Sequence, residues 1–113
     1  MAIDVKAELN YYQVSPQKVR LVIDLVRGKM ADEALTVLKF VNKKSAEPIG
    51  KLIASAMANG ESNFGIPAEK LYIYKIFADE APTRKWRRYG ARGRFKPILR
   101  RSSHINVVLR EKA

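Results

Sequence analysis

Apolar and polar side chains alternate near the start of the chain, from Ala2 to Asn10. The apolar positions of this alternation are Ile3, Val5, Ala7 and Leu9. Because successive side chains of a strand point to opposite faces of a sheet, a repeat of two residues predicts a half-buried strand. A second alternation near the other end of the sequence predicts another strand, and its apolar positions are Ile105, Val107 and Leu109.

A third strand is predicted from Leu71 to Ala78, where β-branched and aromatic residues dominate. Lys75 interrupts the apolar pattern of this segment, which is typical of a β-bulge. Together the three segments predict a small antiparallel sheet.

Three other segments have the spacing of amphipathic helices. The first begins after Ser15, a favourable N-cap residue, with Pro16 at the first helical position, and Gly28 is expected to end it. Its buried stripe comprises Val19, Val22, Ile23 and Val26. Arg20 and Asp24 are four residues apart, so we expect them to form an ion pair on the outer face of this helix.

The second helix is predicted from Ala31 to Phe40, and the polar triplet Asn42-Lys43-Lys44 separates it from the third. The third helix starts after Ser45, and Gly60 is expected to end it. Residues Glu61 to Glu69 are rich in Gly, Asn, Ser and Pro, which predicts a loop.

These elements predict an α+β fold in which three helices pack on a small three-stranded antiparallel sheet. The segment between the last two strands contains Gly90 and Gly93, so we expect it to form one long, protruding β-hairpin. A chain of 113 residues is long enough for one core and too short for two. We therefore expect a single domain over 1–113, with 79–101 as an extended basic arm.

The positive charge of the chain is concentrated in this arm. The formal net charge is +11, and the stretch from Thr83 to Arg101 holds nine basic residues and no acidic one. Trp86, Tyr89 and Phe95 are interleaved with the basic residues, and aromatic rings of this kind can stack on unpaired bases. This pattern favours a nucleic-acid surface over a solvated basic tail, the usual structure of a charge run.

The composition limits the chemistry that the chain can perform. It has no cysteine and only one histidine, His104, so we expect no metal site and no cofactor. The adjacent carboxylates of Asp79 and Glu80 point to opposite faces of a strand, which is a poor arrangement for acid–base catalysis, and we expect them to anchor the base of the arm. A small hydrolase therefore has almost no support, and we predict that the protein is not an enzyme.

No apolar run approaches the roughly 20 residues that span a membrane. The sequence MAIDVKAELN lacks the pattern of a signal peptide. We expect a cytoplasmic protein that has no membrane partner and no small-molecule substrate.

Two short patterns favour other kinds of nucleic-acid binding. The sequence from Gly90 to Gly93 fits the G-x-x-G loop of KH domains, but it lies between predicted strands instead of helices. The turn at Gly28 is compatible with a helix-turn-helix DNA-binding regulator. Asp32 and Glu33 would then place acidic groups where a recognition helix meets DNA, so this alternative stays open as the weaker one.

Several segments resemble a known family, the bacterial-type large-subunit ribosomal protein twenty-two, in their order and spacing over almost the whole chain. They are Ser15 to Lys29, Asn42 to Lys44, Ala54 to Asn59, Ala78 to Pro82, Ala91 to Arg94 and Arg100 to Leu109. The resemblance implies a structural protein of the large ribosomal subunit that binds several domains of rRNA and supports subunit assembly. It also implies that the hairpin lines the polypeptide exit tunnel, next to the nascent chain and among neighbouring large-subunit proteins.

The resemblance and the basic stretch together give a set of rRNA-binding candidates. Those carried over by the resemblance are Ser15, Lys18, Arg20, Arg27, Lys29, Asn42, Lys43, Lys44, Lys85, Arg92, Gly93, Arg94, Arg101, Ser103 and His104. Those added by the basic stretch are Arg84, Arg87, Arg88, Lys96 and Arg100. The predicted tunnel-lining tip comprises Arg88, Tyr89, Gly90, Ala91 and Arg92.

The tip departs from the family pattern, because Tyr89-Gly90-Ala91 stands where Pro-Arg-Ala is common. Ala81 likewise replaces a usual glycine. We expect these changes to affect the conformation of the tip and not the rRNA-binding role.

Overall fold

The computed structural model describes residues 3–82, 84–89 and 95–112. A three-stranded antiparallel sheet has the order β1-β5-β2 and is formed by β1 (Val5–Tyr12), β2 (Leu71–Glu80) and β5 (Ser103–Glu111). The helices are α1 (Pro16–Ile23), α2 (Ala31–Lys39) and α3 (Ala46–Phe64), with a short 3-10 helix, η1, at Ala68–Lys70. Two further strands, β3 (Arg84–Tyr89) and β4 (Phe95–Arg100), pair only with each other among the described residues.

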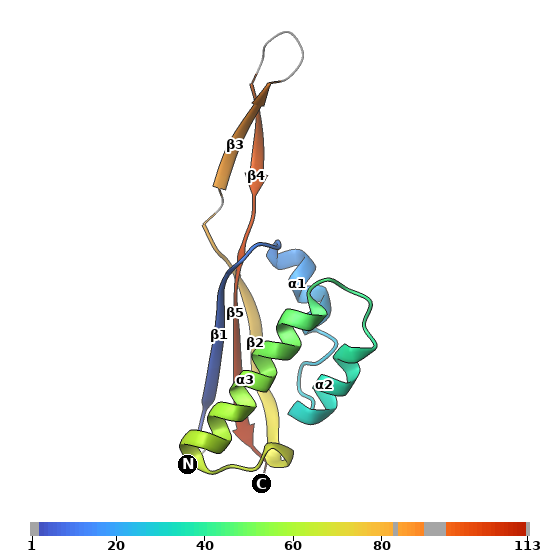
Figure 1. Cartoon of the computed structure of the whole chain (residues 1–113), viewed down its shortest axis with the longest axis vertical. Coiled ribbons are helices and arrows are strands. Elements are labelled where there is room, and N and C mark those ends of the chain that lie inside the picture. The colour runs from blue at the N-terminus through green and yellow to red at the C-terminus, as the bar shows by residue number, and fades with distance from the viewer. Residues whose placement is uncertain (1–2, 83, 90–94, 113) are drawn as a thin grey trace.

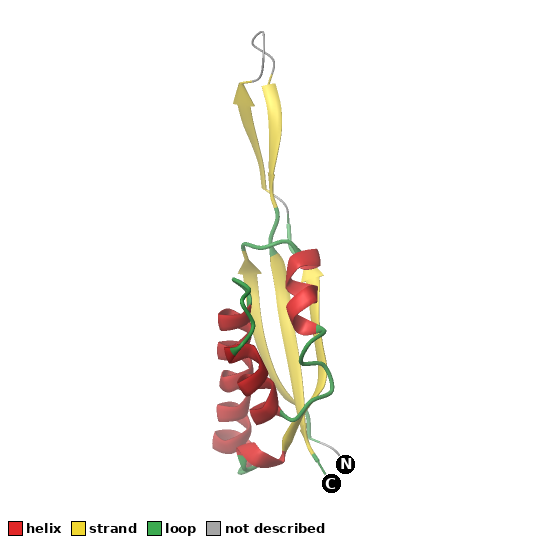
Figure 2. Ribbon diagram, turned by 90° about the vertical axis from the view of Figure 1, so that its right-hand side faces the viewer, coloured by secondary structure: helices red, strands yellow, loops and turns green. Residues whose placement is uncertain are grey.

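The helices lie on one side of the sheet (Figures 1 and 2): α3 packs on β1 and β5, and α1 and α2 pack on β2. The predicted alternation of β5 is confirmed, because Ile105, Val107 and Leu109 are fully buried beneath the helices. As the central strand, β5 pairs with β1 from Val5↔Leu109 to Tyr12↔Ser103. The first strand therefore runs two residues further than the alternation predicted, while Ile3, which precedes it, remains 45% exposed.

Both neighbours of β5 contain a bulge. The predicted bulge at Lys75 is confirmed, because the register of β2 against β5 shifts between Ile73 and Lys75. The second bulge lies in β1 between Leu9 and Tyr12, and there Tyr11 has a φ of 56°, an uncommon value for a residue with a side chain.

The end of α1 differs from the prediction. The helix stops at Ile23, and the chain continues in turns in which the N–H of Leu25 bonds to the carbonyl of Val22 at 3.1 Å. These turns bury Val26, and Gly28 then adopts a φ of 79°. Gly28 thus supplies the left-handed conformation five residues beyond the helix end.

The expected ion pair between Arg20 and Asp24 is also wrong. The Arg20 guanidinium donates instead to the carbonyl oxygen of Ala78 at 2.8 Å, which ties α1 to β2. Asp24 lies 3.2 Å from the guanidinium of Arg27. A carbonyl on the adjacent strand competes successfully for Arg20 because the helix is packed against that strand.

The end of α3 is a further correction. The helix passes through Gly60 and ends at Gly65, whose φ of 65° provides the left-handed cap. Gly60 is buried, and a Cβ there would lie 3.1 Å from Cδ1 of Leu71. The glycine therefore permits a close approach between α3 and β2, and part of the predicted loop is helical instead.

The basic arm begins where the main sheet ends (Figure 1). β3 and β4 pair antiparallel from Arg84↔Arg100 to Tyr89↔Phe95. Pro82 has no N–H to donate, and the last described backbone–backbone bond before the arm joins the N–H of Ala81 to the carbonyl of Ser102 at 3.0 Å. The predicted hairpin is thus present as two ladders in succession, and its tip, 90–94, lies outside the described residues.

Candidate nucleic-acid interface

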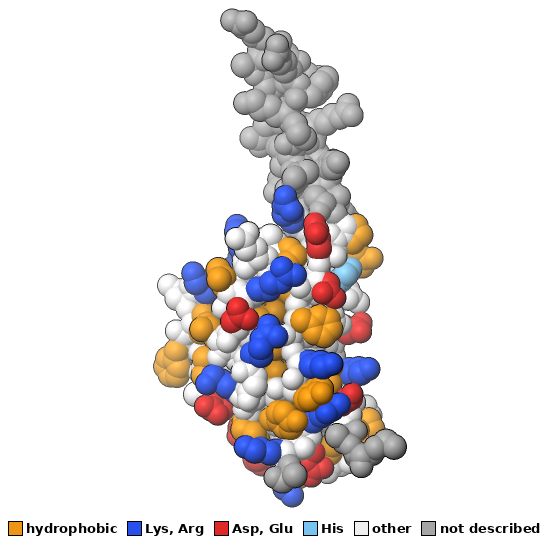
Figure 3. All heavy atoms as spheres, turned by 180° about the vertical axis from the view of Figure 1, so that it is seen from behind, with side chains coloured by type: hydrophobic (Ala, Val, Ile, Leu, Met, Phe, Trp, Pro, Cys, Tyr) orange, Lys and Arg blue, Asp and Glu red, His pale blue; other side chains and the backbone are white. Residues whose placement is uncertain are grey.

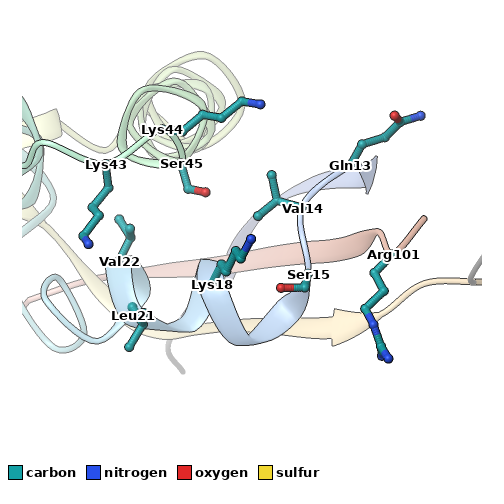
Figure 4. Close-up of a pocket in the computed structure, with 10 residues that line it drawn as sticks. All are labelled: Gln13, Val14, Ser15, Lys18, Leu21, Val22, Lys43, Lys44, Ser45 and Arg101. Atoms are coloured by element: carbon teal, nitrogen blue, oxygen red, sulfur yellow. The ribbon is translucent and has the colours of Figure 1, made fainter. Parts of the chain in front are cut away.

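A hollow of about 810 Å³ lies at the end of the domain from which the arm extends. Three segments that are distant in sequence line it (Figure 4). They are the turn before α1 together with α1 itself, the loop before α3, and the link between β4 and β5. The lining residues are Gln13, Val14, Ser15, Lys18, Leu21, Val22, Lys43, Lys44, Ser45 and Arg101. None of these is acidic.

Five of the predicted rRNA-binding residues meet in this hollow: Ser15, Lys18, Lys43, Lys44 and Arg101. No carboxylate among the described residues forms an ion pair with any of the three lysines. Of the two carboxylates expected to anchor the arm, Glu80 approaches Arg101 at 4.0 Å, and Asp79 forms no ion pair within the described residues. The three lysines therefore concentrate positive charge in the hollow that no described carboxylate compensates.

Two adjacent serines, Ser102 before β5 and Ser103 at its start, tie the segments beneath the hollow together. The hydroxyl of Ser103 donates to the carbonyl oxygen of Val14 at 2.6 Å, and its side chain is fully buried. The hydroxyl of Ser102 donates to the carbonyl oxygen of Pro82 at 3.3 Å. Ser103 was predicted to contact rRNA, and its hydroxyl is occupied within the domain.

The other predicted residues of the domain lie outside the hollow. Arg20 is engaged with β2, and Arg27 is paired with Asp24 on the surface. Lys29 lies 3.9 Å from Glu33, and Asn42 is exposed in the loop between α2 and α3.

His104 lies on β5 beside the bulge of β1. Its Nδ1 accepts a 3.2 Å hydrogen bond from the backbone N–H of Tyr11, and the two rings meet edge to face at 4.7 Å.

The predicted residues of the arm lie on its strands or beyond them. Those on β3 and β4 are Arg84, Lys85, Arg87, Arg88, Lys96 and Arg100, together with the tip residue Tyr89. Arg92, Gly93 and Arg94, and the tip residues Gly90 and Ala91, lie outside the described residues.

Three residues of this region were not predicted from the sequence. Ser45, after which the third helix was predicted to start, makes no capping hydrogen bond from its side chain and lines the hollow. Leu21 is 61% exposed on the hollow's wall, and Phe40, just before the loop that carries the lysines, is 85% exposed. Phe40 is followed within four residues by Lys43 and Lys44, and this pattern in the sequence could have marked it as an exposed aromatic residue beside the basic loop.

The face of the domain seen in Figure 3 has a different character. On the face seen in Figure 3, Lys and Arg side chains are intermixed with Asp and Glu side chains. Elsewhere in the domain, away from the lining of the hollow, the Asp4 carboxylate pairs with the Arg110 guanidinium, which also lies 3.5 Å from the centre of the Tyr74 ring. The hydrogen bond from Arg110 lowers the pKa of Asp4 below its usual value. Acidic side chains accompany the basic ones on the face in Figure 3, whereas none lines the hollow.

No described helix has the length and apolar character needed to cross a membrane. Among the described residues, no three His, Cys, Asp or Glu side chains are grouped so that they could hold a metal ion.

Comparison with known proteins identifies the family. The model of the family described as "Ribosomal protein L22p/L17e" matches residues 7–110. "Large ribosomal subunit protein uL22" of Caldicellulosiruptor saccharolyticus is 48% identical over 106 residues, which cover 94% of this chain and 87% of that protein. The proteins of the same name from Thermoanaerobacter sp. strain X514 and Clostridium novyi are 44% and 41% identical, over 97% and 98% of this chain and 99% and 100% of theirs. The chain therefore belongs to the ribosomal protein L22p/L17e family.

Proposed function

We propose that the hollow and the basic arm are the two surfaces through which this protein binds rRNA in the large ribosomal subunit. Membership of the family makes it a structural ribosomal protein, and this family is not enzymatic. The observation that carries the proposal is the convergence of Lys18, Lys43, Lys44 and Arg101, from three separate segments, on one hollow without acidic residues.

The physical basis of this proposal is electrostatic. Folded rRNA presents closely spaced phosphates, and cations that are not already paired with carboxylates can release counterions when they bind them. The lysines of the hollow meet this requirement, whereas Arg27 and Lys29 are already paired with acidic residues. Binding at the hollow would also direct the arm, because Arg101 joins the hollow to β4.

The arm extends this surface away from the domain. Its nine basic residues would neutralise rRNA along its length, and contact with several rRNA domains would allow the protein to support subunit assembly. Its tip, from Arg88 to Arg92, would then line the polypeptide exit tunnel beside the nascent chain. In this proposal the protein works in the cytoplasmic ribosome, next to neighbouring large-subunit proteins.

The DNA-binding alternative used α1, Gly28 and α2. Asp32 and Glu33 are exposed in the first turn of α2, where a recognition helix would meet phosphates or bases. The acid-free surface lies instead at the start of α1 and in the loop before α3, which favours the ribosomal function over a DNA-binding regulator.

Incorporation into ribosomes tests the proposal. We expect the double variant Lys43→Glu/Lys44→Glu to be depleted from purified large subunits, because two negative charges would replace two positive ones in the hollow. Lys70→Glu changes the charge of an exposed residue of η1, at the opposite end of the domain, and serves as the control. Equal occupancy of the folded double variant and the control would contradict an rRNA-binding role for the hollow.

A further inference from the structure

We infer that the hollow holds a backbone phosphate of rRNA at the point where the N-termini of α1 and α3 converge, an inference that rests on the proposed function. The resemblance already marks Ser15, Lys18, Lys43 and Lys44 as rRNA-binding candidates, and the inference adds Ser45 and the two helix ends as the place where a phosphate is held. Three features of the hollow favour a phosphate there: two helix ends, two serine hydroxyls and three lysines.

Both helix ends open into the same space. α1 has eight residues and begins after Ser15, and α3 has 19 residues and begins after Ser45. Both serines line the hollow. In the first turns, Pro16 and Pro48 have no N–H group. The N–H groups of Lys18 and Ala46 already donate to the carbonyls of Ser15 and Lys43. Each helix end therefore offers the N–H of its second residue, Gln17 or Glu47, and the aligned peptide dipoles give the end a partial positive charge. Two such ends facing one space favour an anion there.

Ser45 provides the independent sign of a ligand. Ser45 is only 4% exposed, yet it lines the hollow. Its side chain makes no capping hydrogen bond to α3. No other hydrogen bond from this hydroxyl is present within the described part of the chain. Figure 4 shows the hydroxyls of Ser45 and Ser15 directed toward the same space from opposite sides. Among the described residues no fully buried side-chain oxygen or nitrogen lacks a partner, so the Ser45 hydroxyl is accessible from the hollow. A phosphate oxygen in the hollow would accept its hydrogen bond.

The surrounding charges favour a phosphate over a neutral ligand. Lys18, Lys43 and Lys44 all line the hollow. Glu47 lies in the first turn of α3 and could in principle repel an anion. Its carboxylate is instead 79% exposed and lies 3.3 Å from the ammonium group of Lys51, outside the lining of the hollow.

The first test uses the full-length protein and inorganic phosphate, without RNA. At constant ionic strength, phosphate should raise the thermal unfolding midpoint more than chloride does, because it binds only the folded state. Ser45→Asp should abolish this gain, although aspartate is a good N-cap residue and should leave the helix intact. Ser15→Asp tests the second helix end at a less buried position. Ser55→Asp adds the same charge to an exposed position on α3, ten residues from Ser45, and should keep the gain.

The second test measures affinity for rRNA as a function of salt concentration. Loss of one hydrogen-bonded phosphate should weaken binding by Ser45→Asp about tenfold or more. It should also flatten the slope of log affinity against log salt by about 0.7 to 0.9. Ser55→Asp should match the unmodified protein in both measurements.

The two tests separate this inference from the proposed function. A phosphate-dependent gain that Ser45→Asp and Ser15→Asp abolish would support the site even if the protein were absent from ribosomes. Normal ribosome incorporation together with an unchanged phosphate response and salt slope in both folded variants would overturn the phosphate site and leave the ribosomal role intact.

Discussion

Ser103 and Val14 are joined by a 2.6 Å hydrogen bond across 89 positions of the sequence, from the serine hydroxyl to the valine carbonyl oxygen. Ser103 begins β5, and Val14 lies in the turn that leads into α1. The bond therefore connects two of the three segments that form the hollow. The buried side chain of Ser103 acts through this connection and not through solvent-exposed contacts.

Replacing Ser103 with Ala should destabilise the domain by about 1–3 kcal/mol, because the carbonyl of Val14 would lose its partner in a partly buried site. Ser102→Ala removes a longer bond, of 3.3 Å, and should have a smaller effect. Urea unfolding of both variants measures the difference. Equal, negligible losses would show that water replaces the serine hydroxyl at Val14.

Patterns that depend on one element alone were predictable from the sequence. The alternation of Ile105, Val107 and Leu109 records a strand with one buried face, and the structure confirms it. Lys75 indicated the bulge in β2 because a charged residue interrupts an otherwise apolar segment. These sequence patterns predict the structure correctly because they depend on neighbouring residues within one strand.

Features that depend on tertiary contacts were not predictable in the same way. Gly60 has the signature of a helix end, yet α3 continues through it because the glycine meets Leu71 of β2. Arg20 has a suitable partner in Asp24, yet it bonds to Ala78 on the neighbouring strand. The hollow requires residues near positions 15, 44 and 101 to come together, so the role of Ser45 becomes visible only in the folded chain.

The two glycines within α3 should respond in opposite ways to replacement by alanine. A Cβ at Gly50 would lie 3.8 Å from the nearest atom, an ordinary contact with Leu38, so Gly50→Ala should stabilise the protein by about 0.5–1 kcal/mol. A Cβ at Gly60 would lie 3.1 Å from buried Leu71, and the resulting strain should cancel or exceed this gain. Thermal unfolding of the two variants provides the comparison. A clear stabilisation by Gly60→Ala would show that the Leu71 side chain on β2 shifts at little cost to make room for the added Cβ.

The core and the arm should contribute unequally to stability. Ile53 is fully buried between the helices and the sheet, so Ile53→Ala should lower the free energy of unfolding by about 2–4 kcal/mol. Replacing 84–100 with a short Gly-rich linker should leave it nearly unchanged, because Arg84 and Arg100 are paired at the arm's base and the main sheet ends before them. Chemical denaturation measures both effects. A loss from arm replacement comparable to that from Ile53→Ala would contradict the independence of the arm.

The Asp4–Arg110 pair should make stability depend on pH in the acid range. The hydrogen bond from Arg110 lowers the pKa of Asp4 in the folded state relative to the unfolded state, where the usual value is 3.8. The stabilisation is therefore fully present above the unfolded pKa and is lost as the pH falls through the folded pKa. Asp4→Asn should be less stable than the unmodified protein at neutral pH, and the difference should shrink in acid. Arg110→Gln should remove the same pH dependence; a difference that persists below both pKa values would refute the assignment to this pair.

Salt dependence should distinguish the arm from the hollow in rRNA binding. If the arm neutralises about six to nine phosphates, the slope of log affinity against log salt should be on the order of −4 to −8. Replacing 84–100 with the linker should remove most of this slope and leave a residual slope from the hollow. Adding Lys43→Ala and Lys44→Ala to the arm-less protein should then flatten the residual slope further, by about 0.7 to 0.9 for each phosphate that the protein no longer neutralises. Filter-binding measurements over a range of salt concentrations, with Lys70→Ala as the matched control, provide the test. An unchanged slope after arm replacement would assign nearly all of the neutralised phosphates to the globular domain, because the arm could then bind only through interactions that release no counterions.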